Sequence, residues 1–279
     1  MPHHSDGSAV TRRHFVRRVS SAAICGLIAA ARPVQGAEQP PPAAGQPSRD
    51  DQVSDLVAAN RILARQGILD GFGHVSVRNA RDPQRFFLSR SRAPDLVSAA
   101  DIQELDLDSR TADARPGYQE RFIHGEIYRA RADVRAIVHG HSPSMIPFGV
   151  TDVPLRPVYH LAAFIGDGVP VFEIRQSSGT TDMLVSDAAR GRALAASLGA
   201  HAAVLMRGHG VVVVGPSLPI VVGRAVYLET NATIQSRALA LGRPITYLDP
   251  EEARQIMNAG ENGGYARSWE LWKQQVSGR

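Results

Sequence analysis

The sequence predicts an α/β domain built on a mostly antiparallel sheet. Apolar segments of strand length are mixed with helical segments, without the regular strand–helix–strand spacing of a parallel sheet. The chain also lacks the glycine-rich motifs G-x-x-x-x-G-K-[ST] and G-x-G-x-x-G, which hold phosphates in many parallel α/β proteins. A hydrophobic content of 43% is ample for a core, and 21% charged residues is ordinary for a soluble globular protein.

The first half of the domain is predicted to begin with a helix and to continue with two short strands. The helix, within residues 51–70, follows from an apolar stripe at helical spacing, formed by Val53, Leu56, Val57, Ile62 and Leu63. Gly67 can end it. Alternating apolar residues predict strands at 74–79 and 85–89, and a second helix is expected at about 120–130.

The second half is predicted to add four strands and three helices. The strands are expected at 135–139, at 170–174 and twice within 202–215, where glycines at 208 and 210 break the apolar run. The helices are expected to start at Pro143, to cover 187–199 and to cover 217–242, with Ser217 as the cap of the last and Gly242 as its stop.

Residues 1–37 have the pattern of an export signal. Paired arginines in "TRRHFVRRV" precede the apolar stretch "VSSAAICGLIAAA", which is too short to span a bilayer of about 30 Å as a helix. Arg12 and Arg13 resemble a twin-arginine signal, which predicts a periplasmic protein without a membrane span in its mature form. The alternative is a disordered basic tail on a cytoplasmic protein. The proline-rich residues 38–50 are predicted to be a disordered linker, and residues 51–279 the folded domain.

The charge balance and the cysteine count exclude several classes of function. Five arginines and one aspartate in residues 1–37 account for the whole formal charge of +4, so the remainder is neutral and no nucleic-acid partner is expected. The single cysteine, Cys25, lies within the predicted signal. A mature protein without it has no thiol catalysis, no disulfide and no thiolate metal site.

Three histidines and one glutamate form a candidate metal centre. His139 and His141 lie two residues apart at the end of a predicted strand, so both side chains can point to the same face. His209 stands between two glycines where two strands meet, and Glu120 begins a predicted helix. Together they suit a divalent cation with a carboxylate as fourth ligand or general base. The alternative is that the histidines are merely polar residues at strand ends.

The motifs "ERFIHGEIYRARADVRAIVHGHSP" and "AVLMRGHGVVVVG" resemble those of the class II aldolase/adducin family, in the same order and at similar separations. The resemblance extends from about Asp51 to Gly242. It implies a three-layer α/β/α sandwich and a homotetramer with active sites between subunits. It also implies one divalent ion on His139, His141 and His209, for which histidine ligands suit Zn²⁺ or Mn²⁺, and also Fe²⁺ or Co²⁺.

The chain departs from the sugar-phosphate members of that family where those members bind phosphate. The matching dipeptides here are Gly73-His74, Ser91-Arg92 and Tyr118-Gln119, so a substrate without phosphate is expected. The segment "SRSR" offers the guanidinium groups of Arg90 and Arg92, whose planar forks match carboxylates. We therefore predict that His74, Arg90, Ser91 and Arg92 bind a small carboxylated substrate. The alternatives are that the arginines are surface charges and that His74 is structural.

Glu120 and His160 are the predicted catalytic residues. His160 and Tyr159 lie where related aldolases contribute a tyrosine from the neighbouring subunit, and an imidazole can deliver a proton near neutral pH. His124, one helical turn after Glu120, is expected to be structural, and His201 to lie on the surface.

These features predict a divalent-metal-dependent carbon–carbon lyase. The pattern "DGFGHVSVR…LSRSRAPDLV" is most similar to the family's decarboxylases of hydroxylated aromatic or pyridine dicarboxylic acids. The first alternative is an aldolase or retro-aldolase acting on a hydroxy-keto acid or sugar derivative. An iron-dependent oxygenase and a non-catalytic, adducin-like interaction module are the others.

Overall fold

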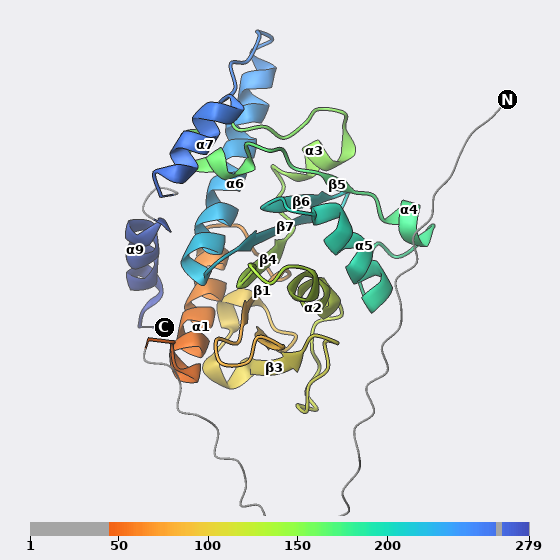
Figure 1. The fold of residues 1–279 in the computed structure, drawn as a ribbon, viewed down its shortest axis with the longest axis vertical. Helices are drawn as coiled ribbons and strands as arrows, with labels where there is room; N and C mark the ends of the chain where they lie inside the picture. Colours follow the sequence, from red (N-terminus) through yellow and green to blue (C-terminus); the bar gives the residue numbers. More distant parts are fainter. Residues whose placement is uncertain (1–44, 261–263, 279) are drawn as a thin grey trace, which may run out of the picture. The chain divides into compact units, whose positions relative to one another are not determined.

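A single seven-stranded sheet organises the computed structural model, which describes residues 45–260 and 264–278 (Figure 1). The strand order is β3-β2-β1-β4-β7-β6-β5, and every neighbouring pair is antiparallel except β5 and β6. The strands are β1 (His74–Arg78), β2 (Arg85–Ser89), β3 (Ile102–Asp106), β4 (Ala136–Gly140), β5 (Val171–Phe172), β6 (Ala203–Met206) and β7 (Gly210–Gly215). The predicted antiparallel character of the sheet is confirmed.

Helices cover both faces of this sheet, as the three-layer sandwich requires. The central strands bury alternate residues on opposite faces: Val211 and Val213 of β7 belong to one apolar cluster, and Val212 and Val214 to the other. The longer helices are α1 (Arg49–Arg65), α2 (Arg121–Ala130), α5 (Ala188–Leu198), α6 (Leu218–Ala240), α7 (Pro250–Asn258) and α9 (Ala266–Val276). Helices α1, α6 and α9 pack on the first cluster, and α2 and α5 on the second (Figure 1).

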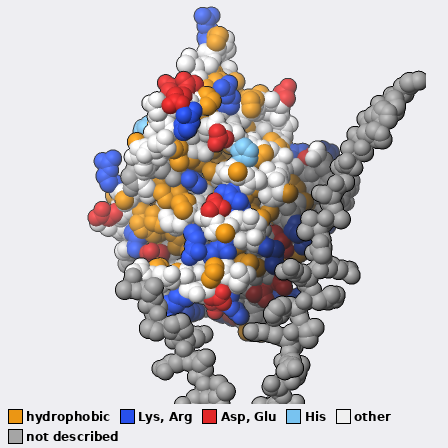
Figure 2. All heavy atoms as spheres, in the orientation of Figure 1, with side chains coloured by type: hydrophobic (Ala, Val, Ile, Leu, Met, Phe, Trp, Pro, Cys, Tyr) orange, Lys and Arg blue, Asp and Glu red, His pale blue; other side chains and the backbone are white. Residues whose placement is uncertain are grey.

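Short helical segments complete the described chain. They are α3 (Ile146–Val150), α4 (Ile174–Ser178), and the 3-10 turns η1 (Pro94–Leu96), η2 (Ala99–Asp101) and η3 (His160–Ile165). None of the helices in the described residues is both long and apolar enough to cross a membrane. Basic and acidic side chains are interspersed over the face drawn in Figure 2, in keeping with the neutral charge balance of the domain.

Several elements differ from the sequence prediction. Helix α1 begins at Arg49, within the predicted linker, because Ser48 accepts a hydrogen bond from the amide of Asp51 (3.1 Å) and the Asp51 carboxylate caps Ser48 in return. The strand expected at 170–174 shrinks to β5, since Glu173 accepts a hydrogen bond from the Arg175 amide and starts α4. The export signal and residues 38–44 of the linker lie outside the described residues.

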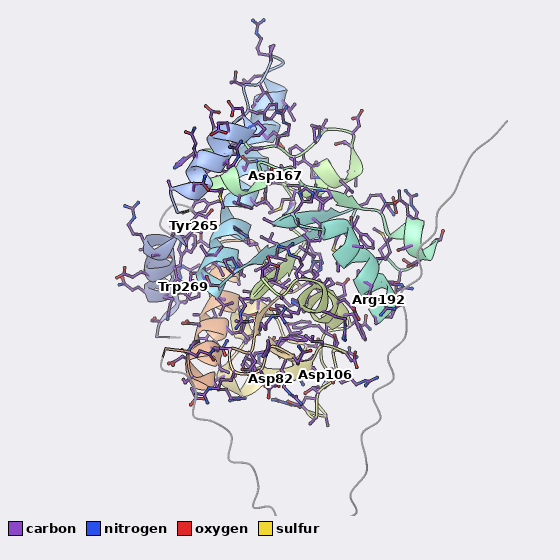
Figure 3. All side chains as sticks on the ribbon, in the orientation of Figure 1. Asp82, Asp106, Asp167, Arg192, Tyr265 and Trp269 are labelled. Atoms are coloured by element: carbon purple, nitrogen blue, oxygen red, sulfur yellow. The ribbon has the colours of Figure 1, made fainter. Side chains whose placement is uncertain are left out.

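The C-terminal helices were not predicted, and α9 is fixed by contacts distant in sequence. The ring of Tyr265 lies directly on Gly223 of α6, where an added Cβ would come within 2.3 Å of the ring. Its hydroxyl donates a hydrogen bond to the Leu161 carbonyl (2.9 Å). Tyr265 and Trp269 mark this junction in Figure 3. Gly223 therefore permits the close approach of the C-terminal segment to α6.

Candidate metal centre

The ends of the central strands bring the predicted histidines together. His139 is buried near the end of β4 and pairs in register with His74 of β1 and Val212 of β7. His141 follows β4 directly. Gly208, with φ of 62°, helps turn the chain between β6 and β7, and at Gly210 an added Cβ would lie only 2.2 Å from the Gly140 carbonyl oxygen. The glycines beside His209 thus allow its ring to reach His141.

Glu120, His139, His141 and His209 offer ligand atoms that all lie within 4.8 Å of one another. The Nε2 atoms of His141 and His209 are 3.2 Å apart. Glu120 Oε2 lies 3.3 Å from His139 Nε2 and 3.5 Å from His209 Nε2. Ligands about 2.1 Å from a tetrahedral ion are separated by about 3.4 Å, so the three distances of 3.2, 3.3 and 3.5 Å match edges of a coordination polyhedron.

The surrounding backbone fixes which ring nitrogens face the centre. His139 Nδ1 donates to the Val211 carbonyl and His209 Nδ1 donates to the Met183 carbonyl, both at 3.1 Å. Each ring therefore keeps its Nε2 lone pair for a cation. The buried Nε2 of His139 has no hydrogen-bond partner among the described residues, which is the arrangement expected of a ligand atom.

A segment that the sequence analysis missed supports two of these side chains. Besides the Met183 carbonyl that holds His209, the amide of Val185 donates to Glu120 Oε1 (2.9 Å) and leaves Oε2 to the histidines. Met183 adopts a positive φ of 68°. The local sequence "TDMLV" does not predict that this segment orients Glu120 and His209, because the hydrogen bonds join residues more than twenty positions apart.

The electrostatics of the cluster favour cation binding. Burial alone would raise the pKa of Glu120, but the facing His139 and His209 hold it well below its usual range. Burial, together with His139 and His209, lowers the pKa of His141 to about 4. Burial would also lower the pKa of His209, yet its hydrogen bond with Glu120 raises it. Near neutral pH the centre therefore presents an anionic oxygen, and a proton and a cation compete for His209.

A cavity of about 430 Å³ opens beside the cluster. It contains three of the four predicted substrate-binding residues and two members of the cluster. Its lining residues are Gly71, Phe72, Gly73, His74, Ser91, Arg92, Ala93, Tyr118, Gln119, Glu120, His141 and Leu184. Apolar and aromatic surfaces thus lie next to the guanidinium group of Arg92, the hydroxyl of Ser91 and the imidazole of His74. This combination suits a flat carboxylated molecule.

The fourth predicted substrate-binding residue, Arg90, does not line this cavity. Its Nε donates to the buried carboxylate of Asp101 (2.7 Å), so its charge is used within the protein. Arg92 lines the cavity. Its Nε–H donates a hydrogen bond to the Leu96 carbonyl (2.6 Å), and the same Nε lies 3.4 Å from Asp101 Oδ2. Asp101 was not identified from the sequence, because its partners come together only in the folded loop.

His74 and His124 form a buried pair beside the cavity. His74 Nδ1 lies 2.6 Å from His124 Nε2, and the His74 ring packs against the Tyr118 ring in a tilted arrangement, with 4.6 Å between the ring centroids. Burial, with the neighbouring histidines, lowers the pKa of His74 well below its usual value, and burial lowers that of His124 to about 3. Both rings are neutral near pH 7. His124 is fully buried, in keeping with its expected structural place.

His160 and Tyr159 stand apart from the cluster. His160 is exposed at the start of η3, and neither residue lines the cavity of its own chain. The preceding segment is held by two buried amides of α6. Asn231 bonds the Val158 amide and the Arg156 carbonyl, and Gln235 bonds the Arg156 amide and the Pro154 carbonyl, at 2.8 to 2.9 Å. His201, which was expected on the surface, is partly exposed, with its Nδ1 enclosed.

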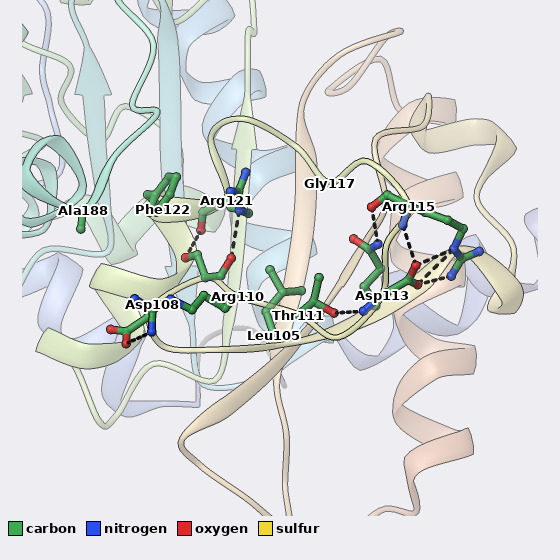
Figure 4. A pocket seen from close by; sticks show the side chains of 12 residues that line it. Leu105, Asp108, Arg110, Thr111, Asp113, Arg115, Gly117, Arg121, Phe122 and Ala188 are labelled. Carbon is green, nitrogen blue, oxygen red and sulfur yellow. Dashed lines mark hydrogen bonds and ion pairs between the residues drawn. The ribbon is translucent and has the colours of Figure 1, made fainter.

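A larger hollow of about 650 Å³ lies beside the start of α2 and is not bordered by the cluster (Figure 4). The guanidinium groups that line it already have acceptors. Arg115 pairs with Asp113 (2.5 Å), Arg121 donates to the Ser109 carbonyl (2.9 Å), and Arg110 lies 3.4 Å from Asp108. No member of the histidine cluster borders it.

Comparison with known proteins agrees with this geometry. Residues 54–236 match the family model described as the class II aldolase and adducin N-terminal domain. The decarboxylase tropJ of Talaromyces stipitatus is 34% identical over 80% of this chain and 93% of its own length. The 3,4-dihydroxyphthalate decarboxylase of Rhodococcus jostii is 27% identical over 77% and 91%. The solved L-fuculose 1-phosphate aldolase of Glaciozyma antarctica superposes with a TM-score of 0.67 at 22% identity, covering 85% of this chain and 93% of its own.

Proposed function

The chain belongs to the class II aldolase/adducin family and is a lyase, and on that premise we propose that it is a metal-dependent decarboxylase of a hydroxylated aromatic or heteroaromatic acid. The observation that carries the proposal is the convergence of four ligand atoms beside a cavity that also presents Arg92 and aromatic surface. The names of the two decarboxylase relatives support the same reaction. The name of the second, a 3,4-dihydroxyphthalate decarboxylase, supports a substrate with adjacent ring hydroxyl and carboxylate groups.

His139, His141, His209 and Glu120 would hold the divalent ion, which we expect to be Zn²⁺ or Mn²⁺, with Fe²⁺ or Co²⁺ as alternatives. When bound, it supplies a Lewis acid for adjacent hydroxyl and carboxylate oxygens of the substrate. Arg92 pairs with a substrate carboxylate, and Phe72 and Tyr118 offer their rings to the flat substrate. The bond from the ring carbon to the departing carboxylate breaks, carbon dioxide leaves, and the ring carbon takes up a proton.

The source of that proton follows from where the candidates lie. Glu120 is ionised within the ligand set and therefore holds the ion in this arrangement instead of donating a proton. His160 and Tyr159 do not line the cavity of their own chain. We therefore propose a homotetramer in which a neighbouring copy presents His160, or Tyr159, to the cavity.

The test is metal analysis of the purified full chain combined with a screen for carbon dioxide release. The protein should contain about one divalent ion per chain and decarboxylate hydroxyaromatic acids, with 3,4-dihydroxyphthalate as the first candidate. His139→Ala, His141→Ala and His209→Ala should each weaken metal binding and lose activity, because each change removes one of the four ligand atoms. His201→Ala, outside the cluster, is the matched control and should keep both.

If one of the three histidine variants keeps the wild-type metal content and activity, the replaced histidine is not a metal ligand. Metal binding without carbon dioxide release, but with cleavage of a hydroxy-keto acid, would instead identify the aldolase alternative. Oxygen consumption with an iron-loaded protein would identify the oxygenase alternative. The name of one relative, 32% identical over 52% of this chain, includes an oxygenase activity. Absence of bound metal and of all three activities would favour the adducin-like interaction module.

A further inference from the structure

A buried chain of hydrogen bonds connects the cavity to Tyr128 of α2. It starts at Tyr128, whose hydroxyl lies 2.8 Å from the Ser76 hydroxyl. Ser76 Oγ lies 2.6 Å from His124 Nδ1, and His124 Nε2 lies 2.6 Å from His74 Nδ1. Tyr128, Ser76 and His124 are at most 1% exposed, while His74 borders the cavity.

The direction of this chain can be worked out by counting protons. Each neutral imidazole has one N–H donor and one acceptor nitrogen, and each hydroxyl has one proton to donate. If His74 donated toward the interior, His124 Nδ1 would donate to Ser76 Oγ, and the single bond between the Ser76 and Tyr128 hydroxyls could use only one of their two protons. One of these buried hydroxyls would then be left with a proton and no acceptor among the described residues. A buried donor without an acceptor costs about 1–3 kcal/mol.

The opposite direction leaves no buried donor unpaired. Tyr128 donates to Ser76, Ser76 donates to His124 Nδ1, and His124 Nε2 donates to His74 Nδ1. The one remaining proton is then on His74 Nε2, which has no hydrogen-bond partner among the described residues. That proton is available to a molecule in the cavity.

We propose that Tyr128, Ser76 and His124 are positioning residues that lock His74 as an Nε2–H donor toward an anionic oxygen of the substrate. This inference rests on the proposed function for the identity of the acceptor, but the direction of the chain does not. A neutral donor fixed in this way recognises a carboxylate or phenolate oxygen and disfavours a substrate group that is itself a donor. His74 is thereby a specificity-determining residue, although it lies outside the metal ligand set.

The decisive measurement is the tautomer of His74, read from long-range proton–nitrogen correlation spectra of the full chain loaded with diamagnetic Zn²⁺. Signals are assigned by their loss in His74→Gln and His124→Gln. In the wild type, both His74 and His124 should carry their proton on Nε2. A proton on His74 Nδ1 would overturn the proposal.

Two matched variants test whether the chain sets the tautomer. Tyr128→Phe should keep the wild-type tautomer, because the Ser76 hydroxyl still needs His124 Nδ1 as its acceptor. Ser76→Ala should give a mixture of the two His74 tautomers, because His124 Nδ1 then has no partner in either direction of the chain. Metal content should be unchanged in both variants, since neither residue belongs to the cluster. If Ser76→Ala keeps a single Nε2–H tautomer, the hydroxyl chain does not control His74 and the proposal fails.

The donor role is read from the binding of 2,3-dihydroxybenzoate, a hydroxyaromatic carboxylate, by calorimetry. Ser76→Ala should weaken binding by about 3- to 10-fold, the value of one ordinary hydrogen bond, and Tyr128→Phe by less. Equal binding by wild type and Ser76→Ala would refute the donor role. If the wild type binds neither this probe nor 3,4-dihydroxyphthalate, the proposed function fails, while the tautomers still decide the direction of the chain.

Discussion

At the scale of single residues, Arg90 and Arg92 show how similar side chains acquire different tasks. Both belong to the segment "SRSR", and both have the geometry to pair with a carboxylate. Arg90 is committed to Asp101 at 2.7 Å, whereas Arg92 uses its Nε on the Leu96 carbonyl and lines the cavity. We therefore assign Arg92, and not Arg90, to the substrate carboxylate.

Arg92→Ala should lower kcat/KM for a dicarboxylic hydroxyaromatic acid by about 10- to 150-fold, the value of a lost charge-assisted hydrogen bond. Metal content should stay at the wild-type level. Lysine at this position should restore only part of the activity, because a point charge does not reproduce the guanidinium fork. The corresponding monocarboxylic acid should be a poor substrate of the wild type and nearly insensitive to the change. Equal losses with both substrates would mean that Arg92 orders the loop instead.

At the scale of elements, the loop between β2 and β3 is held from inside by one carboxylate. Asp101 accepts hydrogen bonds from the Ser98 amide (3.0 Å), from the Ser98 hydroxyl (2.7 Å) and from Arg90. Burial alone would raise the pKa of Asp101, but these bonds, with Arg92 nearby, lower it to about 2. The loop that carries Ser91 and Arg92 to the cavity is thus stabilised by an ionised side chain.

Because the folded-state pKa of Asp101 is below the unfolded value, its ionisation stabilises the native state above about pH 4. This contribution is lost as the pH falls from about 4 to about 2. Asp101→Asn should therefore lower the free energy of unfolding by about 1–2 kcal/mol at pH 6, and the difference from wild type should shrink toward pH 2.5. Urea unfolding across this range measures both. A difference that does not change with pH would show that the loss comes from altered packing.

At the scale of the whole molecule, the site depends on segments that are far apart in the chain. Glu120 begins α2, His139 lies near the end of β4, His141 follows that strand, and His209 precedes β7. The antiparallel pairing of β4 with β7 brings the three histidines together, and the packing of α2 on the sheet adds Glu120. The same domain is preceded by the predicted export signal, which lies outside the described residues.

We propose that the protein is exported to the periplasm by the twin-arginine route. Replacing both Arg12 and Arg13 by Lys should retain the full-length precursor in the cytoplasm, because the export receptor reads the guanidinium pair. Immunoblots of the periplasmic and cytoplasmic fractions measure this. Arg17→Lys with Arg18→Lys is the matched control and should leave export unchanged. An unchanged periplasmic yield of the Arg12/Arg13 variant would refute the route and leave the enzymatic proposal intact.

The sequence by itself determined most of the sheet, the main helices and the family. These features are encoded locally, in the period of apolar residues and in caps such as Ser217, which accepts from the Ile220 amide at the start of α6. It also identified the histidines at positions 139, 141 and 209, because their flanking motifs are distinctive. Strand β3 and helices α7 and α9 were not predicted.

Only the tertiary structure decided which of these groups act together. It placed Glu120 Oε2 among the histidines, tied Arg90 to Asp101, and connected His74 to Tyr128 through Ser76 and His124. It also showed that Met183 and Val185 fix the orientation of two cluster members. Each of these roles depends on a hydrogen bond across at least eleven positions of sequence. Such partners are selected by how the strands and loops pack, which no local pattern of residues specifies.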